Sequence, residues 1–348
     1  MVIILKNNIS NNQENNLRTL FRNKKIDVIP VLNRKNKMFV VTGRCGEMAM
    51  KEIESNKAVS SVIKVNRAYK LASKSFKNSR SVIKLNELNI GGKEIVIMAG
   101  PCSVETKLQI NHISEGVKLA GCKVLRGGAF KPRTGPYDFQ GLGEIGLKYL
   151  KEAARISSLK VVTEVMDVRD IEIIEKYTDI FQVGARNMQN YPLLKELGKL
   201  RKPVLLKRGM WATYKELLLA SEYILLGGNE NVILCERGIR THVPETRFTL
   251  DLNAVAYLKH ETHLPIFVDP SHGTGRANMV RAMSRAAIAA GADGLIIETH
   301  IDPRKSISDA DYESELTDRV IRLEAEISMV DEKIAELKEA HPKSKDRT

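Results

Sequence analysis

Short runs of β-branched and other apolar residues alternate with amphipathic stretches from about residue 80 to residue 300. The runs are bounded by Gly, Pro, Asp or Asn, which is typical of buried strands. Between them, as in residues 142–157 and 276–292, apolar residues recur every three or four positions, the spacing of a helix that buries one face. The expected strands are residues 94–100, 123–128, 160–165, 179–184, 203–209, 231–238, 265–272 and 294–300.

Strands that are each followed by a helix predict an α/β fold, here a (β/α)₈ TIM barrel. A doubly wound open sheet is the main alternative architecture. It usually has fewer strands and a glycine-rich dinucleotide-binding turn, which this sequence lacks. We therefore expect a catalytic barrel over residues 85–312.

The first 70 residues show a different order of elements. Strand patterns at 2–5, 27–32, 37–43 and 59–65 are interleaved with helical patterns at 14–23 and 45–56. This βαββαβ order predicts a small ferredoxin-like domain over residues 1–70, joined by a linker at 71–84. Residues 82–94 read as a short hairpin with Gly91 and Gly92 at its turn, placed to cap the bottom of the barrel.

A helical pattern begins near Asp311, and we assign residues 313–348 as a closing helix with a charged C-terminal tail. One interpretation is the closing helix of the barrel with a solvated extension. The other is an association helix, although the apolar repeat lasts for too few heptads to indicate a long coiled coil.

Composition narrows the function classes. Of the 348 residues, 43% are apolar, and no apolar run approaches the roughly 20 residues that span a bilayer. Residues 1–16 do not resemble a signal peptide, so we expect a cytoplasmic protein without membrane contact. The four cysteines form no CxxC pair, which argues against a disulfide framework. The net charge of +13 comes with only 5% aromatic residues and no base-reading motif, so we expect no nucleic-acid partner.

Catalytic side chains of such barrels come from the C-terminal ends of the strands. The residues at those positions include six cationic side chains, which are expected to converge on one opening of the barrel. So much positive charge is too costly to leave unpaired in a partly dry cavity. An anionic ligand with more than one phosphate or carboxylate group is expected, because guanidinium groups bind such oxygens bidentately. The cationic residues are Arg126, Lys131, Arg133, Arg186, Lys207 and Arg237.

A second set at the strand ends combines one sulfur, one imidazole and two carboxylates. These donors suit a divalent transition metal such as Mn²⁺, Fe²⁺, Co²⁺ or Zn²⁺. A single buried thiol is more often an inert core residue than a metal ligand, and a single histidine is as often structural as functional. The prediction therefore rests on the strand-end position that these residues share. The residues are Cys102, His272, Glu298 and Asp309.

With these residues in hand, the chain resembles the type I-beta class of 3-deoxy-D-arabino-heptulosonate 7-phosphate (DAHP) synthase. The motifs "AGPCSVE", "RGGAFKPRTGPYDFQG", "GARNMQN", "LLKRG", "CERGIRT" and "DPSHGTGR" occur in that family's order over residues 80–310. The most specific is "KPRT" followed by "PYDFQG". The chain departs from the family pattern at "SDADYES", where Ala310 replaces a common glycine.

The resemblance implies a condensation of phosphoenolpyruvate with D-erythrose 4-phosphate that releases phosphate, at the entry to the shikimate pathway. It implies the same four metal ligands, and Lys131, Asp269 and His272 as catalytic residues. Phosphoenolpyruvate would be held by Arg126, Lys131, Ala185, Arg186, Lys207 and Arg237. Erythrose 4-phosphate would be held by Pro132, Arg133, Thr134, Asp269 and Ser271. The resemblance also implies a homotetramer and feedback inhibition through the N-terminal domain, with tyrosine or phenylalanine as effector.

Three alternatives stay open at this point. The sister enzyme 3-deoxy-D-manno-octulosonate 8-phosphate synthase would use the same barrel with arabinose 5-phosphate. A Schiff-base aldolase would use Lys207 as the nucleophile. A catalytically inactive barrel would only bind metabolites. Independently of these, the N-terminal domain could serve for packing or association instead of regulation.

Overall fold

The computed structural model describes residues 1–33, 36–43, 45–308 and 314–315. The N-terminal part has the expected βαββαβ order, and its elements are β1 (Val2–Leu5), α1 (Asn11–Asn23), β2 (Val28–Leu32), β3 (Lys37–Val41), α2 (Glu47–Glu54) and β4 (Val59–Ile63). The strands form an antiparallel sheet in the order β2-β3-β1-β4, which confirms the ferredoxin-like arrangement. Ser10 and Gln13 form a reciprocal capping box that fixes the start of α1.

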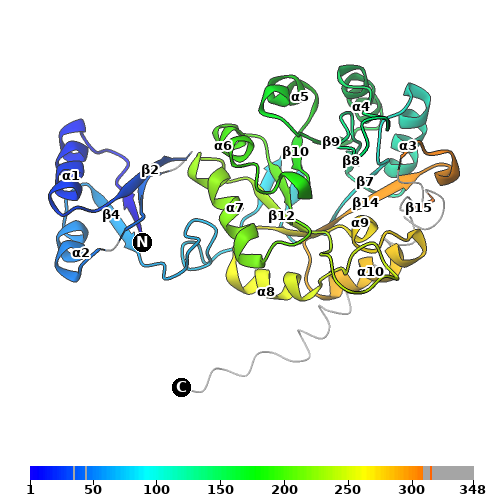
Figure 1. Cartoon of the computed structure of the whole chain (residues 1–348). Helices are drawn as coiled ribbons and strands as arrows, with labels where there is room; N and C mark the ends of the chain where they lie inside the picture. Colours follow the sequence, from blue (N-terminus) through cyan, green and yellow to red (C-terminus); the bar gives the residue numbers. More distant parts are fainter. Residues whose placement is uncertain (34–35, 44, 309–313, 316–348) are drawn as a thin grey trace.

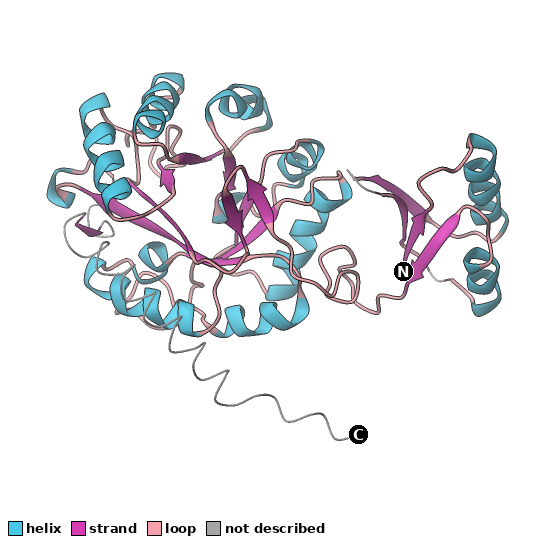
Figure 2. Ribbon diagram, turned by 180° about the vertical axis from the view of Figure 1, so that it is seen from behind, coloured by secondary structure: helices cyan, strands magenta, loops and turns pink. Residues whose placement is uncertain are grey.

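Nine parallel strands of the described residues form a second sheet, and all of them except β15 close into a barrel. The expected strands are confirmed as β7 (Val96–Gly100), β8 (Val124–Arg126), β9 (Lys160–Glu164), β10 (Ile180–Val183), β11 (Val204–Lys207), β12 (Val232–Glu236), β13 (Ile266–Val268) and β14 (Gly294–His300). Figures 1 and 2 show helices around this ring of strands. The (β/α)₈ prediction is therefore confirmed.

The helices that follow the strands cover the outside of the barrel (Figure 1). They are α3 (Lys107–Leu119), α4 (Glu144–Ile156), α5 (Ile171–Tyr177), α6 (Tyr191–Lys199), α7 (Tyr214–Leu226), α8 (Asn253–Glu261) and α10 (Ala277–Ala289). The short α9 (Pro270–Thr274) lies directly after β13, and 3-10 turns occur at Val168–Asp170, Ala185–Asn187 and Pro303–Lys305. Among the described residues, no helix is long and apolar enough to cross a bilayer.

The C-terminal prediction is only partly covered by the structure. Residues 316–348, which carry most of the predicted helix, and residues 309–313, which include Asp309 and Ala310, lie outside the described residues. Ser314 and Glu315 form β15, which pairs in parallel with Thr299 and His300 of β14. The helix expected from Asp311 therefore does not include these two residues, because their backbone groups pair with a strand instead.

The hairpin before the barrel consists of β5 (Ile83–Leu85) and β6 (Leu88–Ile90). Its turn lies at residues 86–87, where Asn86 adopts a φ of 55°, so the turn predicted at Gly91 and Gly92 was wrong. Asparagine tolerates this left-handed conformation, which hairpin turns need. Gly91 serves a close approach instead, since a Cβ there would lie 2.6 Å from the carbonyl oxygen of Ser81.

The hairpin fills one end of the barrel. Its residues Ile83, Leu88 and Ile90 pack in one buried cluster with the inward-facing residues of the strands. The cluster includes the first residues of β7 and β8, Val96 and Val124, so the hairpin covers the N-terminal ends of the strands, as predicted. The opposite end remains open for a binding site.

The N-terminal sheet lies beside the barrel (Figure 1), and specific contacts join the two. Val2, Val31 and Val40 belong to the same buried cluster as residues of the barrel helices. The carboxylate of Glu222 on α7 accepts hydrogen bonds from the backbone N–H groups of Lys70, at 2.9 Å, and Ala72, at 2.7 Å. The segment that connects the sheet to the barrel is therefore fixed along the barrel wall.

Candidate active site

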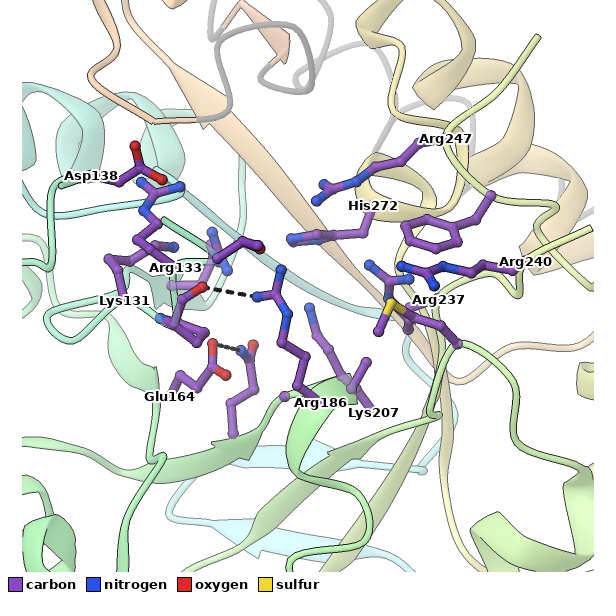
Figure 3. Close-up of a pocket in the computed structure, with 18 residues that line it drawn as sticks. Lys131, Arg133, Asp138, Glu164, Arg186, Lys207, Arg237, Arg240, Arg247 and His272 are labelled. Atoms are coloured by element: carbon purple, nitrogen blue, oxygen red, sulfur yellow. Dashed lines mark hydrogen bonds between the residues drawn. The ribbon is translucent and has the colours of Figure 1, made fainter. Parts of the chain in front are cut away.

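A cavity of about 540 Å³ opens at the C-terminal ends of the barrel strands (Figure 3). It lies where the predicted site residues come together, although they are far apart in the sequence. The predicted residues that line it are Arg126, Lys131, Pro132, Arg133, Thr134, Ala185, Arg186, Lys207, Arg237 and His272. The cavity wall is therefore strongly cationic.

Four of the cationic side chains are almost fully buried: Arg126, Lys131, Lys207 and Arg237. Arg126 donates a hydrogen bond of 2.7 Å to Glu298, and Lys207 one of 2.5 Å to Asp269. Nη1 of Arg237 is buried and has no hydrogen-bond partner among the described residues, and burial lowers the pKa of this guanidinium. A buried charge of this kind is costly, so the wall is built to receive an anionic group.

Asp269 organises the turn after β13. As the N-cap of α9 it accepts the backbone N–H of His272 at 2.9 Å, Pro270 follows at the first helical position, and Gly275 ends the turn with a φ of 66°. Its Oδ2 lies 2.7 Å from Nδ1 of His272 and 2.5 Å from Nζ of Lys207. Burial raises the pKa of Asp269, but the charges of His272 and Lys207 outweigh it and hold the pKa well below its usual value.

His272 and Glu298 face each other, with Nε2 of the imidazole 3.4 Å from Oε1 of the carboxylate. Since Asp269 occupies Nδ1 of His272, Nε2 is free to act as an electron-pair donor. Oε2 of Glu298 is buried without a hydrogen-bond partner among the described residues. Burial raises the pKa of Glu298, but His272, Arg126 and Lys131 lower it to about 2, so the group is a carboxylate. An orphaned buried carboxylate oxygen beside an imidazole fits a bound cation.

Cys102 lies at the strand end next to Glu298. Its sulfur is 2.9 Å from Nζ of Lys131, and Arg126 bridges the carbonyl oxygen of Pro101, at 2.8 Å, to Glu298. Within the described residues, however, no three His, Cys, Asp or Glu side chains come close enough together to hold a metal. The fourth predicted ligand, Asp309, lies outside those residues. The four-residue ligand set therefore stays a prediction, and the donor atoms of Cys102, His272 and Glu298 are of the kinds that such a metal binds.

Ser271 and Asp269 lie behind the cavity wall. Both side chains are buried, and neither lines the cavity. The hydroxyl oxygen of Ser271 accepts the backbone N–H of Glu298 at 3.0 Å, which ties the end of β13 to the end of β14. The structure therefore brings these residues to the predicted ligands His272 and Glu298, and their contact with erythrose 4-phosphate stays a prediction.

The "KPRT" segment forms the rim opposite the β12 loop. Nε of Arg133 donates to the carbonyl oxygen of Phe139 at 3.1 Å, and Nη1 of Arg186 donates to that of Pro132 at 2.9 Å. Arg133 stands across the cavity from Arg237 (Figure 3), and Thr134 also lines the cavity.

Several lining residues were not predicted from the sequence. Glu164 is the last residue of β9, and its Oε2 accepts a hydrogen bond of 3.3 Å from Gln182, so the strand-end test applied to this strand would have found it. Asp138, Gln182, Gly184, Met210, Arg240, Arg247 and Phe248 also line the cavity. Arg240, Arg247 and Phe248 lie in the loop between β12 and α8, which shows no pattern that indicates which side chains turn inward.

Comparisons with known proteins agree with this site. The model of the DAHP synthetase I family matches residues 58–336. The phospho-2-dehydro-3-deoxyheptonate aldolase of Thermotoga maritima is 51% identical over 258 residues, which is 74% of this chain and 76% of that protein. The crystal structure of a DAHP synthase from Thermotoga maritima is similar with a TM-score of 0.73 and 41% identity, covering 97% of both chains.

More distant relatives carry a different name. The 2-dehydro-3-deoxyphosphooctonate aldolase of Syntrophotalea carbinolica is 28% identical over 246 residues, covering 65% of this chain and 88% of that protein. A second solved structure carries the DAHP synthase name: a truncated form of the Thermotoga maritima enzyme is 44% identical with a TM-score of 0.71, covering 76% of this chain and 97% of that chain.

The family match, the 51% identity and the cationic cavity together lead to one conclusion: the chain is an enzyme that belongs to the DAHP synthetase I family.

Proposed function

We propose that this enzyme condenses phosphoenolpyruvate with D-erythrose 4-phosphate and water to give DAHP and inorganic phosphate. The observation that carries the proposal is the cavity lined by Arg126, Lys131, Arg186, Lys207 and Arg237, beside the His272–Glu298 pair. Two multiply charged substrates can approach each other only where their charges are offset, and fixed cations supply that compensation.

Phosphoenolpyruvate binds on the buried cations in this proposal. Its carboxylate and its phosphate each present a pair of oxygens that a guanidinium fork can bind bidentately. The unpartnered Nη1 of Arg237 and the buried Lys207 lie on the wall that would face these oxygens. Arg133 and Thr134, on the opposite rim, would contact the phosphate of erythrose 4-phosphate, with Pro132 beside them. The two substrates then meet between the rim and the buried wall.

Cys102, His272 and Glu298, with Asp309, would hold a divalent transition metal such as Mn²⁺. When bound, such an ion polarises a carbonyl oxygen as a Lewis acid. Carbon 3 of phosphoenolpyruvate forms a bond to the aldehyde carbon, and the aldehyde oxygen takes a proton from Lys131. Water adds to carbon 2 and loses a proton, which returns to Lys131. The carbon–oxygen bond to phosphate breaks, and phosphate leaves with the electron pair. The proton of the carbon 2 hydroxyl passes to the leaving phosphate, so hydrogen phosphate and a ketone at carbon 2 are formed.

Lys131 suits the role of proton carrier because it is held in the charged form. Burial lowers the pKa of Lys131, but the neighbouring charges of Cys102 and Glu298 outweigh it and raise the pKa above its ordinary value. Its Nζ lies 2.9 Å from both the sulfur and the carbonyl oxygen of Cys102, so the ammonium group is fixed at the cavity wall. A fixed donor at this point contributes by proximity to the reacting oxygen.

A Schiff-base reaction through Lys207 is disfavoured by the same geometry. The amine of Lys207 is 2.5 Å from the carboxylate of Asp269, and an ammonium group in an ion pair is not a nucleophile. Two treatments separate the reactions. We expect chelation of metal to abolish activity and Mn²⁺ to restore it. Borohydride that trapped the aldehyde substrate on Lys207 would contradict the proposal.

The remaining proposals concern the chain as a whole. We propose domains at residues 1–70 and 85–312, with 71–84 as linker and 313–348 as C-terminal segment. We propose that the N-terminal domain mediates feedback inhibition by tyrosine or phenylalanine in a homotetramer, and that the enzyme opens the shikimate pathway. A cytoplasmic location would supply its phosphorylated substrates, which do not cross membranes freely. Deletion of residues 1–70 should remove inhibition by the effector, and unchanged inhibition would exclude this role.

A further inference from the structure

The aromatic ring of Phe248 lies against the guanidinium group of Arg237. The guanidinium carbon is 4.2 Å from the ring centroid, a distance at which a cation over an aromatic face is attracted to it. Phe248 is 7% exposed and Arg237 is 5% exposed, so the contact is shielded from water. Because Nη1 of Arg237 has no hydrogen-bond partner among the described residues, the ring is a principal restraint on the plane of this guanidinium.

The backbone around Phe248 is itself anchored to the turn that carries His272. The N–H of Phe248 donates to the carbonyl oxygen of Gly273 at 3.2 Å, and that of Arg247 donates to Thr274 at 2.9 Å. Gly238, with a φ of 90°, leaves room for the ring, since a Cβ there would lie 2.7 Å from the Cβ of Phe248. The ring is therefore placed by the backbone of two strand ends and is not free to drift.

A second cation lies near the same ring. The guanidinium carbon of Arg247 is 5.5 Å from the ring centroid. Arg237 and Arg247 stand on the same side of the cavity as His272 (Figure 3). Two guanidinium groups in one corner repel each other, and the electron-rich face of the ring offsets part of that repulsion.

We propose that Phe248 is a positioning residue for phosphoenolpyruvate, whose ring holds the guanidinium of Arg237 in the plane that receives the anion. This inference rests on the proposed function. Through Phe248, the loop between β12 and α8 then contributes to the phosphoenolpyruvate-binding site. The competing explanation is that the ring only fills space between the loop and the His272 turn.

Ring-removing and ring-keeping substitutions separate these explanations. In Phe248→Leu, we expect the KM for phosphoenolpyruvate to rise about 3- to 30-fold, the range of a desolvated cation–π contact. The kcat and the KM for erythrose 4-phosphate should change by less than about 2-fold. Phe248→Tyr keeps the ring face and should restore the KM. Phe76→Leu, which removes a partly buried ring packed on the core away from the cavity, is the matched control.

Binding without turnover keeps this test independent of the proposed reaction. Trp211 is the only tryptophan of the chain and follows Met210, which lines the cavity, so its fluorescence can report titration with phosphoenolpyruvate alone. Loss of affinity in Phe248→Leu would support the inference even if erythrose 4-phosphate proved to be the wrong second substrate. Wild-type affinity in Phe248→Leu would overturn it.

A double-mutant cycle tests whether the ring acts through Arg237. In an Arg237→Lys background, Phe248→Leu should weaken phosphoenolpyruvate binding no further, because the planar cation that stacks on the ring is gone. An equal further loss in that background would overturn the inference. So would a weakened Mn²⁺ affinity with unchanged phosphoenolpyruvate affinity, since the ring would then act on the His272 turn. If Phe248→Leu does not fold, Phe248→Met serves as the ring-removing variant.

Discussion

The ammonium group of Lys131 lies 2.9 Å from the sulfur of Cys102. Both side chains are buried, and they come from the loops that follow two neighbouring strands, β7 and β8. The contact joins the proposed proton carrier to a proposed metal ligand. Substitutions at either residue should therefore affect more than one property of the enzyme.

Cys102→Ala should remove most of the activity and weaken Mn²⁺ binding, because it deletes a proposed ligand and one of the two groups to which the Lys131 ammonium donates. Cys122→Ala is the matched control, since Cys122 is an equally buried cysteine in the core away from the cavity. Turnover with added Mn²⁺ and the Mn²⁺ dissociation constant should be measured for both variants. Retention of wild-type turnover by Cys102→Ala would show that the metal assignment is wrong.

Asp269→Asn should weaken Mn²⁺ binding or activity by about 10- to 100-fold, the usual cost of losing the carboxylate behind a metal-binding histidine. Oδ2 of Asp269 accepts from both Lys207 and His272, and Oδ1 accepts the backbone N–H of His272. The asparagine has only one oxygen and no negative charge, so its NH2 group must replace one of these acceptors, and the ion pair with Lys207 is lost. Mn²⁺ titration and steady-state kinetics report the two effects separately. Unchanged values for both would mean that Asp269 does not orient His272.

His263 predicts a pH dependence of stability away from the active site. Burial lowers its pKa from 6.5 to about 4, while its ring nitrogens contact the carbonyl oxygen of Leu71 at 2.7 Å and the hydroxyl of Ser81 at 2.8 Å. The unfolded chain therefore binds a proton that the folded chain refuses between pH 6.5 and 4. This contribution to stability is present above pH 6.5 and is lost as the pH falls, by about 3 kcal/mol in total.

The comparison with His263→Gln isolates that contribution. The free energy of unfolding of the wild type should fall more steeply with decreasing pH than that of His263→Gln, which has no proton to gain. Urea titrations at pH 7.5, 6, 5 and 4.5 would provide the two curves. Parallel curves would exclude His263 as the source.

Gly100→Ala should destabilise the fold by about 2 kcal/mol or more. Gly100 has a φ of 150°, and a Cβ there would lie 2.0 Å from the carbonyl oxygen of Arg126. The added methyl group must push apart β7 and β8, which carry Cys102 and Arg126 at their ends. Gly43→Ala is the control, because its nearest contact would be an ordinary 3.7 Å. Equal melting temperatures of the two variants would contradict the reasoning.

The strand-and-helix order was predictable because each barrel strand is buried on both sides and therefore consists of apolar residues, as in Val204–Leu206. The site was predictable for a related reason. Residues at the C-terminal ends of parallel strands converge, so Lys207 and Arg237 could be assigned to one cavity without knowledge of any distance.

The rest depended on local geometry that the pattern does not encode. A glycine can form a turn or allow two segments of backbone to pack closely. Gly91 allows close packing against the carbonyl oxygen of Ser81, while Asn86 makes the turn. Ser271 follows a strand end, but the short α9 turns its hydroxyl toward Glu298 and away from the cavity. Phe248 and Arg247 reach the cavity through a long loop, which backbone contacts with Gly273 and Thr274 hold in place.

The choice of aldehyde tests the central claim most directly. Release of inorganic phosphate from phosphoenolpyruvate should be measured with Mn²⁺ and either erythrose 4-phosphate or arabinose 5-phosphate, at matched concentrations. We predict kcat/KM at least about 100-fold higher with erythrose 4-phosphate, a difference of about 3 kcal/mol between the two transition states. Equal or faster turnover of arabinose 5-phosphate would contradict the account.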